Sequence, residues 1–435
     1  MRISVIGVGY LGAVHAAAMA DLGHTVVGVD VDEAKIAALS EARAPFFEPG
    51  LPDVLASATA SGRLRFTTDF AAIADADVHF VAVGTPQAAE GDAADLRFVD
   101  AAFESLLGHI KPGDVIVGKS TVPVGTASRL AELVAERVPG ATLAWNPEFL
   151  REGFAVKDTV SPDRLVYGVP EGEEGARAAR ILDEVYAAAV ANGTPVIVTD
   201  YATAELVKVA ANAFLATKIS FINAMAEIAE ATGADVTQLA DAIGHDARIG
   251  RRFLNAGVGF GGGCLPKDIR AFSARARELG RGDSVRFLDE VDKINLRRRG
   301  RVVDLVREEA GGLDGVRVAV LGLAFKPHSD DIRDSPALDI AVRLAEGGAI
   351  VSATDPEANA NARRRAPQLT YAESAAEAAA GADIVVLITE WPEFTGLDPE
   401  ELGALVSHRR VIDGRNALDA ERWRAAGWRF RGLGR

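Results

Sequence analysis

Short runs of Val and Ile recur through the first 200 residues, separated by alanine-rich segments with helical spacing of their apolar positions. This alternation is typical of parallel strands joined by crossover helices. The pattern therefore predicts an α/β domain over residues 1–200. Its clearest predicted strands are Ile3–Gly7, Thr25–Asp30, Asp77–Val83, Val115–Lys119 and Val196–Thr199.

The pattern changes at Tyr201, where one long amphipathic helix is predicted as far as Thr232, with more helix up to about Leu296. A second alternating block follows. It predicts buried strands at Val316–Leu321, Ile350–Thr354, Asp383–Ile388 and Arg410–Asp413. We therefore expect an α/β fold with two Rossmann-like parallel-sheet domains, 1–200 and 301–435, joined by a long central helix and a helical region, 201–300.

Composition narrows the expected partners. The net charge of -15 disfavours nucleic acid and anionic membranes, since both attract basic surfaces. The single cysteine, Cys264, excludes an intramolecular disulfide and is compatible with a cytoplasmic protein. We find no apolar stretch of the ~20 residues that span a bilayer, and no pattern typical of a metal site.

A glycine fingerprint follows the first predicted strand. Gly7-Val8-Gly9-Tyr10-Leu11-Gly12 opens a helix, and Asp30 ends the next strand. In this context the glycines bring the backbone close to a pyrophosphate at a helix N-terminus, while the aspartate accepts ribose hydroxyls and repels a 2′-phosphate. The motif predicts NAD as the cofactor. Lys35 either reaches the adenosine phosphates or is a solvated lysine.

Three further segments and one pair of residues carry candidate chemistry in the first 212 residues. Val83–Pro86 and Lys119–Pro123 follow strands, where hydroxyls can touch a cofactor, although each is more often a turn. In Asn146–Gly153, an N-cap and a first-turn proline predict a short helical turn with Glu148 and Glu152 on one face. Two such carboxylates repel each other, so either at least one of them holds a proton near neutral pH or the segment is an exposed acidic turn. Lys208 and Asn212, four apart, suit oxyanion stabilisation or a helix edge.

The segment Gly257–Asp268 is the sharpest local signal. Its glycines allow backbone amides to pack against a ligand, and Pro266 predicts the start of a helix just after Cys264. A helix N-terminus and the nearby Lys267 favour the thiolate, so a nucleophilic cysteine is preferred over an inert one. In the last domain, Lys326, Arg333 and Arg415 either clamp an anionic group or are unrelated surface charges.

The chain resembles the nucleotide-sugar 6-dehydrogenases over essentially its whole length. The resemblance rests on NPEFLREG at 146–153, GFGGGCLPKD at 259–268 and GLAFKP at 322–327. It implies oxidation of the C6 alcohol of UDP-glucose to the carboxylate of UDP-glucuronate, with two NAD per turnover. GDP-mannose as substrate, and a non-catalytic nucleotide-sugar-binding protein, remain alternatives. The chain departs from the family pattern at Gly263, where many relatives have Ser, and at Lys35, where some have Arg.

The resemblance also implies residue roles. Cys264 attacks the aldehyde-level intermediate and Glu148 is the acid–base group. Lys208 and Asn212 stabilise oxyanions, Asp268 orients the water or the thiol, and Thr121 holds a water. The cofactor residues are Gly7, Gly9, Tyr10, Leu11, Gly12, Asp30, Lys35, Thr85, Thr121, Glu152, Lys267 and Arg333. The substrate residues are Phe149, Leu150, Glu152, Lys208, Asn212, Arg248, Phe253, Phe260, Gly261, Cys264, Phe325, Lys326 and Arg415.

The predicted helix Tyr201–Thr232 is too long to be covered by one small α/β domain, so we expect it to carry a contact between subunits. The resemblance places Arg248 at the substrate of the neighbouring subunit. The expected assembly is a homodimer or a larger association of dimers, with sites built across a two-fold interface.

Overall fold

The structure, a computed structural model, describes residues 1–435. The chain packs into two compact units, one of Met1–Ala211 with Ala274–Leu279 and one of Asn212–Ser273 with Gly280–Arg435. Helices α9 (Tyr201–Thr232) and α11 (Leu265–Glu278) contribute residues to both. Residues 201–300 are thus divided between the units, and the organisation into three domains stays a prediction.

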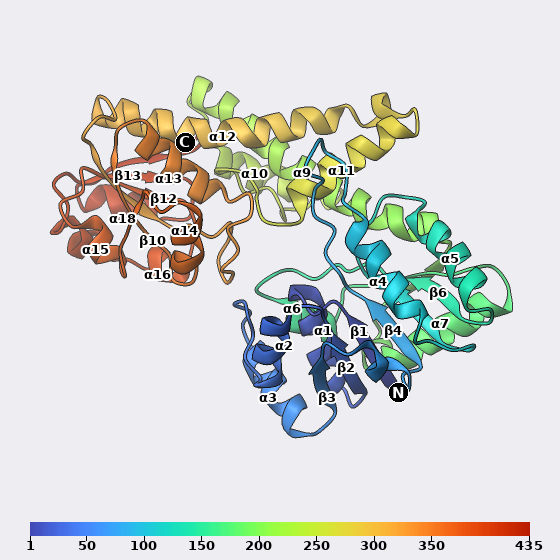
Figure 1. The fold of residues 1–435 in the computed structure, drawn as a ribbon. Coiled ribbons are helices and arrows are strands. Elements are labelled where there is room, and N and C mark those ends of the chain that lie inside the picture. Colours follow the sequence, from blue (N-terminus) through green and yellow to red (C-terminus); the bar gives the residue numbers. More distant parts are fainter. The chain divides into compact units, whose positions relative to one another are not determined.

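The first unit is built on an eight-stranded sheet of order β3-β2-β1-β4-β5-β6-β7-β8 (Figure 1). All neighbours are parallel except β6 and β7, which pair antiparallel at Trp145 and Gly168. The first six strands have the order of a dinucleotide-binding sheet. The strands are β1 (Arg2–Ile6), β2 (Thr25–Val29), β3 (Leu64–Thr67), β4 (Val78–Val81), β5 (Val115–Gly118), β6 (Thr142–Trp145), β7 (Leu165–Gly168) and β8 (Val196–Thr199).

Helices cover both faces of this sheet because strand side chains alternate between two apolar cores. On β5, Val115 and Val117 join the core under one set of helices, and Ile116 joins the other. The first set is α1 (Tyr10–Asp21), α2 (Glu33–Ser40), α3 (Leu51–Ala60), α6 (Ala155–Val160), α7 (Glu173–Val185) and α8 (Ala187–Ala191). The second set is η1 (Phe70–Ile73), α4 (Arg97–Leu107), α5 (Thr126–Arg137) and the start of α9.

The second unit contains a six-stranded, wholly parallel sheet of order β11-β10-β9-β12-β13-β14. This is again the order of a Rossmann-type sheet, so the prediction of two such folds is confirmed. The strands are β9 (Arg317–Leu321), β10 (Ile350–Thr354), β11 (Thr370–Tyr371), β12 (Ile384–Leu387), β13 (Arg410–Asp413) and β14 (Arg429–Gly432).

The helices of the second unit fall into two groups. Those that precede the sheet are the later part of α9, α10 (Val236–Gly244), the first part of α11, η2 (Gly282–Val285) and α12 (Phe287–Ala310). Those within the sheet's connections are α13 (Pro336–Glu346), α14 (Asn359–Arg365), α15 (Ala375–Ala379), α16 (Pro392–Thr395), α17 (Pro399–Gly403) and α18 (Ala420–Ala425).

Helix α9 is long and apolar enough, by length and composition, to cross a membrane. The expectation that no such stretch exists is therefore wrong. Core helices pass the same test, and the polar side chains of α9 are used within the second unit. Ser220 Oγ donates to the Val291 carbonyl oxygen at 2.7 Å, and Asn223 Oδ1 accepts from the Gly257 amide at 2.8 Å. These bonds make α9 part of a folded core.

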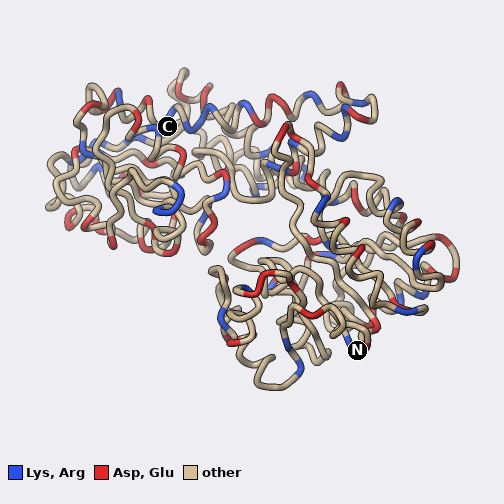
Figure 2. The backbone as a smooth tube through the Cα atoms, in the orientation of Figure 1, with Lys and Arg blue, Asp and Glu red and all other residues tan.

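Charged residues of both signs are interspersed along the backbone of each unit (Figure 2). The excess of 62 Asp and Glu over 47 Lys and Arg therefore does not come from a single acidic tail.

Candidate active site

The turn from β1 to α1 has the geometry of a dinucleotide fingerprint. Gly7 has a φ of +86°, and a Cβ at Gly12 would lie 1.8 Å from the Gly7 carbonyl oxygen. Glycine is therefore required at both positions, the first for its backbone conformation and the second for close packing of helix on strand.

The N-terminus of α1 fits a phosphate ligand. Gly9 is the N-cap, no side chain hydrogen-bonds to the first-turn amides, and a Cβ at Gly9 would meet nothing within 4 Å. Tyr10 and Leu11, in the first turn, pack against the core and fix the helix start. A helix start with uncapped amides and open space before it suits a pyrophosphate.

Asp30 follows β2 beside this turn. Its Oδ2 accepts from the Val8 amide at 2.9 Å and from Lys35 Nζ at 3.1 Å, while Oδ1 accepts from the Asp32 amide at 3.1 Å. Because a carboxylate offers about four lone-pair positions, acceptor capacity remains on Oδ1 for a ribose hydroxyl. Lys35, for which a phosphate contact and a solvated position are both open from the sequence, forms an ion pair with Asp30.

The loops after β4 and β5 are tied together by hydroxyl groups. Thr85 Oγ1 donates to the Thr121 carbonyl oxygen at 2.8 Å, and Ser120 Oγ donates to the Val83 carbonyl oxygen at 2.6 Å. Both loops lie at the carboxyl ends of neighbouring strands, where ligands of open α/β sheets bind.

Glu48 is a residue that sequence reasoning missed. Its carboxylate accepts from the Tyr10 hydroxyl, from the Gly153 amide at 2.6 Å and from the Ala155 amide at 2.7 Å. Burial and the Glu48 carboxylate raise the pKa of Tyr10 well above its ordinary value, with a smaller contribution from Glu152. Glu48 thus joins the start of α1 to the end of the segment that carries Glu148 and Glu152.

The prediction of a helical turn starting at Asn146 is wrong. Residues 146–150 are irregular, and the next helix, α6, begins at Ala155. Asn146 does not cap because its side chain is used elsewhere: Nδ2 donates to the Val166 carbonyl oxygen at 3.0 Å, and Oδ1 accepts from two other side chains. Glu148 and Glu152 therefore do not share a helix face.

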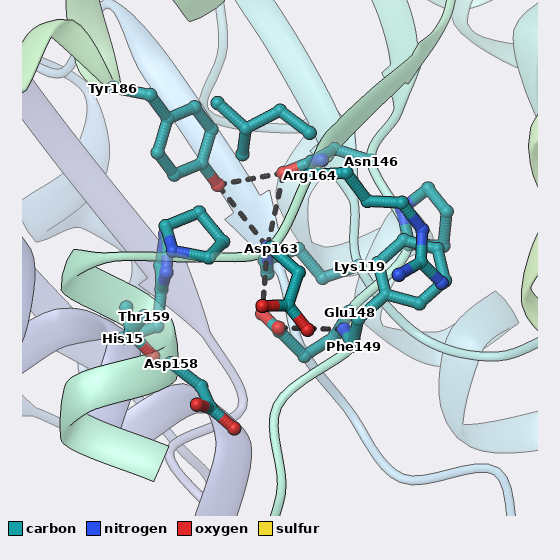
Figure 3. Close-up of a pocket in the computed structure, with 13 residues that line it drawn as sticks. His15, Lys119, Asn146, Glu148, Phe149, Asp158, Thr159, Asp163, Arg164 and Tyr186 are labelled. Atoms are coloured by element: carbon teal, nitrogen blue, oxygen red, sulfur yellow. Dashed lines mark hydrogen bonds and ion pairs between the residues drawn. The ribbon is translucent and has the colours of Figure 1, made fainter. Parts of the chain in front are cut away.

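The two side chains that donate to Asn146 Oδ1 are Lys119 and Tyr186. They form a buried polar network with Asn146 and Glu148 (Figure 3). Lys119 Nζ lies 3.0 Å from Glu148 Oε2, 3.0 Å from Asn146 Oδ1 and 3.2 Å from the Tyr186 hydroxyl oxygen. The Tyr186 hydroxyl donates to Asn146 Oδ1 at 2.7 Å. The network lines a small pocket that His15 and Asp163 also reach.

Glu148 is charged at neutral pH. Burial would raise the pKa of its carboxyl, but the positive charge and hydrogen bond of Lys119, with the amides of Leu150 and Phe149, hold the pKa below its ordinary value. Of the two carboxyl groups, Glu148 is therefore not the one that holds a proton near neutral pH. An ionised, partly buried carboxylate suits a general base.

Lys208 lies on α9 in the first unit and is 8% exposed. Its Nζ is 5.4 Å from the centroid of the Phe149 ring, and Arg164 Cζ is 3.9 Å from the same centroid. Phe149, in the segment next to Glu148, therefore holds two cations against its ring.

Cys264, in the second unit, is exposed and directly precedes α11. Its carbonyl oxygen accepts from the Asp268 amide at 3.0 Å, so the thiol stands at the N-terminus of this helix, as predicted. Asp268 is 2% exposed and accepts from Asn212 Nδ2 at 2.7 Å and from Lys267 Nζ at 2.6 Å. The structure brings these four predicted residues into one local group.

The glycine-rich loop before Cys264 packs against protein. A Cβ at Gly259 would lie 2.2 Å from Asn295 Oδ1, and a Cβ at Gly261 would lie 2.3 Å from the Asp334 carbonyl oxygen. Asn295 Oδ1 also accepts from the Phe260 amide at 2.7 Å, and the Gly262 amide donates to the Arg333 carbonyl oxygen at 2.9 Å. Several of the amides expected to face a ligand are therefore already bonded.

Arg415 bridges loops of the second unit. Its guanidinium donates to the carbonyl oxygens of Ile388 at 2.6 Å, Gly259 at 2.9 Å and Phe325 at 3.1 Å. Arg333 forms a bidentate pair with Asp331, and Lys326 Nζ lies 5.3 Å from the Phe325 ring centroid. The three cations predicted to clamp an anion each have interactions within the protein.

Two predicted substrate residues are exposed in the loop after α10. Arg248 is paired only with Asp246 of the same loop, and 89% of its side chain is exposed. Phe253 is 39% exposed and has a φ of +65°, which is costly for a bulky residue and recurs at functional sites.

Known proteins match the chain over its whole length. Residues 1–190, 202–297 and 319–420 match the NAD binding, central and UDP binding domains of the UDP-glucose/GDP-mannose dehydrogenase family. A UDP-glucose 6-dehydrogenase of Rhizobium meliloti (strain 1021) is 44% identical over 100% of both chains. One of Bacillus subtilis (strain 168) is 41% identical over 100% of this chain and 93% of its own.

Among solved structures, a UDP-glucose dehydrogenase from Pyrobaculum islandicum superposes with a TM-score of 0.89 at 40% identity, covering 100% of this chain and 97% of its own. The sheet order, the glycine fingerprint and the three matched regions all indicate the same family. The chain belongs to the UDP-glucose/GDP-mannose dehydrogenase family.

Proposed function

We propose that this chain oxidises the C6 alcohol of UDP-glucose to the carboxylate of UDP-glucuronate. The observation that carries the proposal is Cys264 at the N-terminus of α11, grouped with Asp268 and Asn212 in a chain similar over its full length to UDP-glucose 6-dehydrogenases. The overall reaction consumes the alcohol, two NAD⁺ and one water, and it yields the carboxylate, two NADH and three protons.

The first oxidation needs a base for the alcohol proton. Glu148, held as a carboxylate by Lys119, takes the proton from the C6 hydroxyl. The N-terminus of α1 and the Asp30 carboxylate would hold NAD by its pyrophosphate and ribose, and the cofactor would supply the hydride acceptor for both oxidations. The product of this step is an aldehyde.

The second oxidation uses the cysteine. The Cys264 thiolate adds to the aldehyde carbon and gives a thiohemiacetal, which loses a second hydride and becomes a thioester. Lys208 and Asn212 stabilise the oxyanion of the tetrahedral intermediates. Thr121 holds a water, and Asp268 orients it for hydrolysis, which releases the carboxylic acid and regenerates the thiol.

The test is a count of NADH per sugar with UDP-glucose, GDP-mannose and UDP-N-acetyl sugars. We expect two NADH per UDP-glucose, and no complete turnover by Cys264→Ser, because serine does not form a readily hydrolysed thioester. If kcat/KM is highest with GDP-mannose, then GDP-mannose replaces UDP-glucose as the proposed substrate. Tight binding of UDP-glucose without NADH would indicate a non-catalytic binding protein.

We also propose that the enzyme is a homodimer, and that it is cytoplasmic. Along α9 in the second unit, Phe214, Phe221 and Ile228 follow one another at intervals of seven residues and are 67%, 49% and 59% exposed. A stripe of this kind is typical of a helix packed against a second copy. Arg248 is exposed enough to reach a neighbouring subunit.

The dimer is tested by mixing two nearly inactive variants, Arg248→Ala and Cys264→Ser. If Arg248 acts on the neighbouring site, hybrid dimers contain one intact site and activity returns. A fully active monomer in light scattering under assay conditions contradicts the proposal.

A further inference from the structure

Lys119 has three polar partners and is buried. It follows β5 and is 3% exposed, and its ammonium contacts Glu148, Asn146 and the Tyr186 hydroxyl. An ammonium has three donors, so all of them are used. A buried ion pair is weak evidence for stability, because apolar residues of similar volume often replace one without loss. The charge of Lys119 therefore calls for a role beyond the fold.

Both oxygens of the Glu148 carboxylate are fixed. Oε2 contacts Lys119 Nζ at 3.0 Å, and Oε1 accepts from the amides of Phe149 at 2.8 Å and Leu150 at 2.9 Å. Figure 3 shows the carboxylate at the pocket, between Lys119 and the Phe149 segment. One side chain supplies the single contact to Oε2, so its removal frees that oxygen to turn.

We propose that Lys119 is a positioning residue for the acid–base step, which fixes the Glu148 carboxylate in one orientation through a buried ion pair. The proposal rests on the proposed function, in which Glu148 accepts the proton of the C6 hydroxyl. Lys119 itself touches neither reacting atom.

The other charged and titratable groups that line this pocket do not replace Lys119. They are His15, Asp158, Asp163, Arg164 and Tyr186. Burial lowers the pKa of His15 well below its ordinary value, so it is neutral, and burial raises the pKa of Tyr186, so it stays a phenol. Arg164 lies over the Phe149 ring.

The partners of Lys119 determine in which direction its loss shifts the pH dependence of the reaction. Burial would lower the pKa of Lys119, yet Glu148 and Tyr186 raise it to about 12, so the lysine stays charged through the working range. Without that charge, burial becomes the dominant influence on Glu148 and raises its pKa. The Glu148 carboxyl then keeps its proton up to a higher pH, so a smaller fraction of the base is ionised on the acid side of the pH profile.

The experiment is a pH profile of kcat/KM and kcat for Lys119→Met with UDP-glucose and NAD. We expect the acid limb to move up by about one pH unit or more, so that kcat at a pH on that limb is roughly 10-fold lower and recovers as the pH rises past the displaced limb. KM for both substrates should change less than about 3-fold, since Lys119 binds neither. Lys119→Arg keeps the positive charge, so its acid limb should lie close to the wild-type position.

Lys111→Met is the matched control. Lys111 precedes the amino end of β5, whereas Lys119 follows its carboxyl end, and its Nζ pairs with Asp114 at 3.0 Å. Its loss should leave the pH profile in place. If Lys119→Met does not fold, Lys119→Gln keeps hydrogen-bond donors without the charge and should show the same displaced limb.

A double-mutant cycle separates positioning from stability. If Lys119 acts through Glu148, then Lys119→Met/Glu148→Gln should be no more than about 2-fold slower than Glu148→Gln alone. An equal loss in kcat at every pH, or the same loss on the Glu148→Gln background, would overturn the proposal. Wild-type kcat in Glu148→Gln alone would instead remove Glu148 from the proposed function.

Discussion

The second sheet of this protein repeats the order of the first six strands of the first sheet, yet the two sheets differ in what they offer a ligand. In each, the first strand is followed directly by a glycine with positive φ, Gly7 at +86° and Gly322 at +106°. In each, an aspartate follows the second strand and accepts backbone amides from the turn after the first, Asp30 from Val8 and Asp355 from Leu323 and Ala324. The two sheets therefore correspond in the residues at these turns as well as in strand order.

The difference lies at the helix that follows. Helix α1 begins at Tyr10 with no side-chain cap, whereas α13 begins at Pro336 after a loop and is capped by Ser335, whose Oγ accepts from Ala337 at 3.2 Å. Asp355 also accepts from Trp391 Nε1 at 3.1 Å and is 3% exposed. In the second sheet the helix N-terminus is capped and the aspartate is buried and hydrogen-bonded. Neither is therefore available to a dinucleotide as its counterpart in the first sheet is.

This comparison indicates that strand order alone does not make a dinucleotide site. An uncapped helix N-terminus and an aspartate with spare acceptor capacity are also needed. A nucleotide bound by the second unit, which matches a UDP binding domain, must rely on other groups.

The largest effect is expected at the helix-strand contact of the first sheet. Gly12→Val places a side chain against the Gly7 carbonyl oxygen, 1.8 Å from the Cβ position. We expect loss of NAD binding by about 100-fold or more, or failure to fold, because the clash is with backbone. Fluorescence titration with NADH measures the affinity. Gly300→Ala, within α12 and with open space around its Cβ, is the control and should stabilise by up to about 1 kcal/mol.

The paired substitutions Asp30→Asn and Asp355→Asn test the comparison directly. Asp355→Asn turns an amide nitrogen toward buried donors and should lower the free energy of unfolding by about 3 kcal/mol with little change in KM for NAD. Asp30→Asn should cost under about 1 kcal/mol but raise KM for NAD roughly 10-fold. Urea unfolding and steady-state kinetics measure both. Exchanged phenotypes would show that the aspartates have the opposite roles.

A smaller effect is expected at the cap of α13. Ser335→Ala removes the hydroxyl that accepts from the first-turn amides and should cost about 1 kcal/mol of stability. The free energy of unfolding in urea measures it, with KM for NAD unchanged. A large rise in that KM would mean that the second sheet contributes to NAD binding.

The smallest effect concerns Lys35. Its ion pair with Asp30 partly neutralises the charge that opposes a 2′-phosphate. Lys35→Met should therefore increase the preference for NAD over NADP by about 2- to 5-fold, since a partly exposed ion pair is worth only about 0.2–1 kcal/mol. The ratio of kcat/KM for the two cofactors measures the change. An unchanged ratio would mean that Lys35 does not influence the choice.

Sequence pattern predicted the strands that carry the ligand-binding turns. Ile3–Gly7, Thr25–Asp30 and Ile350–Thr354 agree with β1, β2 and β10 to within about a residue or two, because buried parallel strands are continuous apolar runs. Short strands such as β7 (Leu165–Gly168) were not predicted. Nor was the antiparallel step from β6 to β7, since pairing between strands leaves little local signal.

The sequence by itself determined the two sheets, the fingerprint at Gly7–Gly12, the helix start after Cys264 and the family. Each of these depends on residues close together in the chain, whose propensities act locally. Only the tertiary structure decided the state of Glu148, because Lys119 lies 29 residues before it and Tyr186 follows it by 38. The same holds for Asn146, which the sequence assigned to a helix cap and which the fold uses to hold a buried lysine. A buried charge takes whatever partner the fold brings within reach, so its environment is decided by packing.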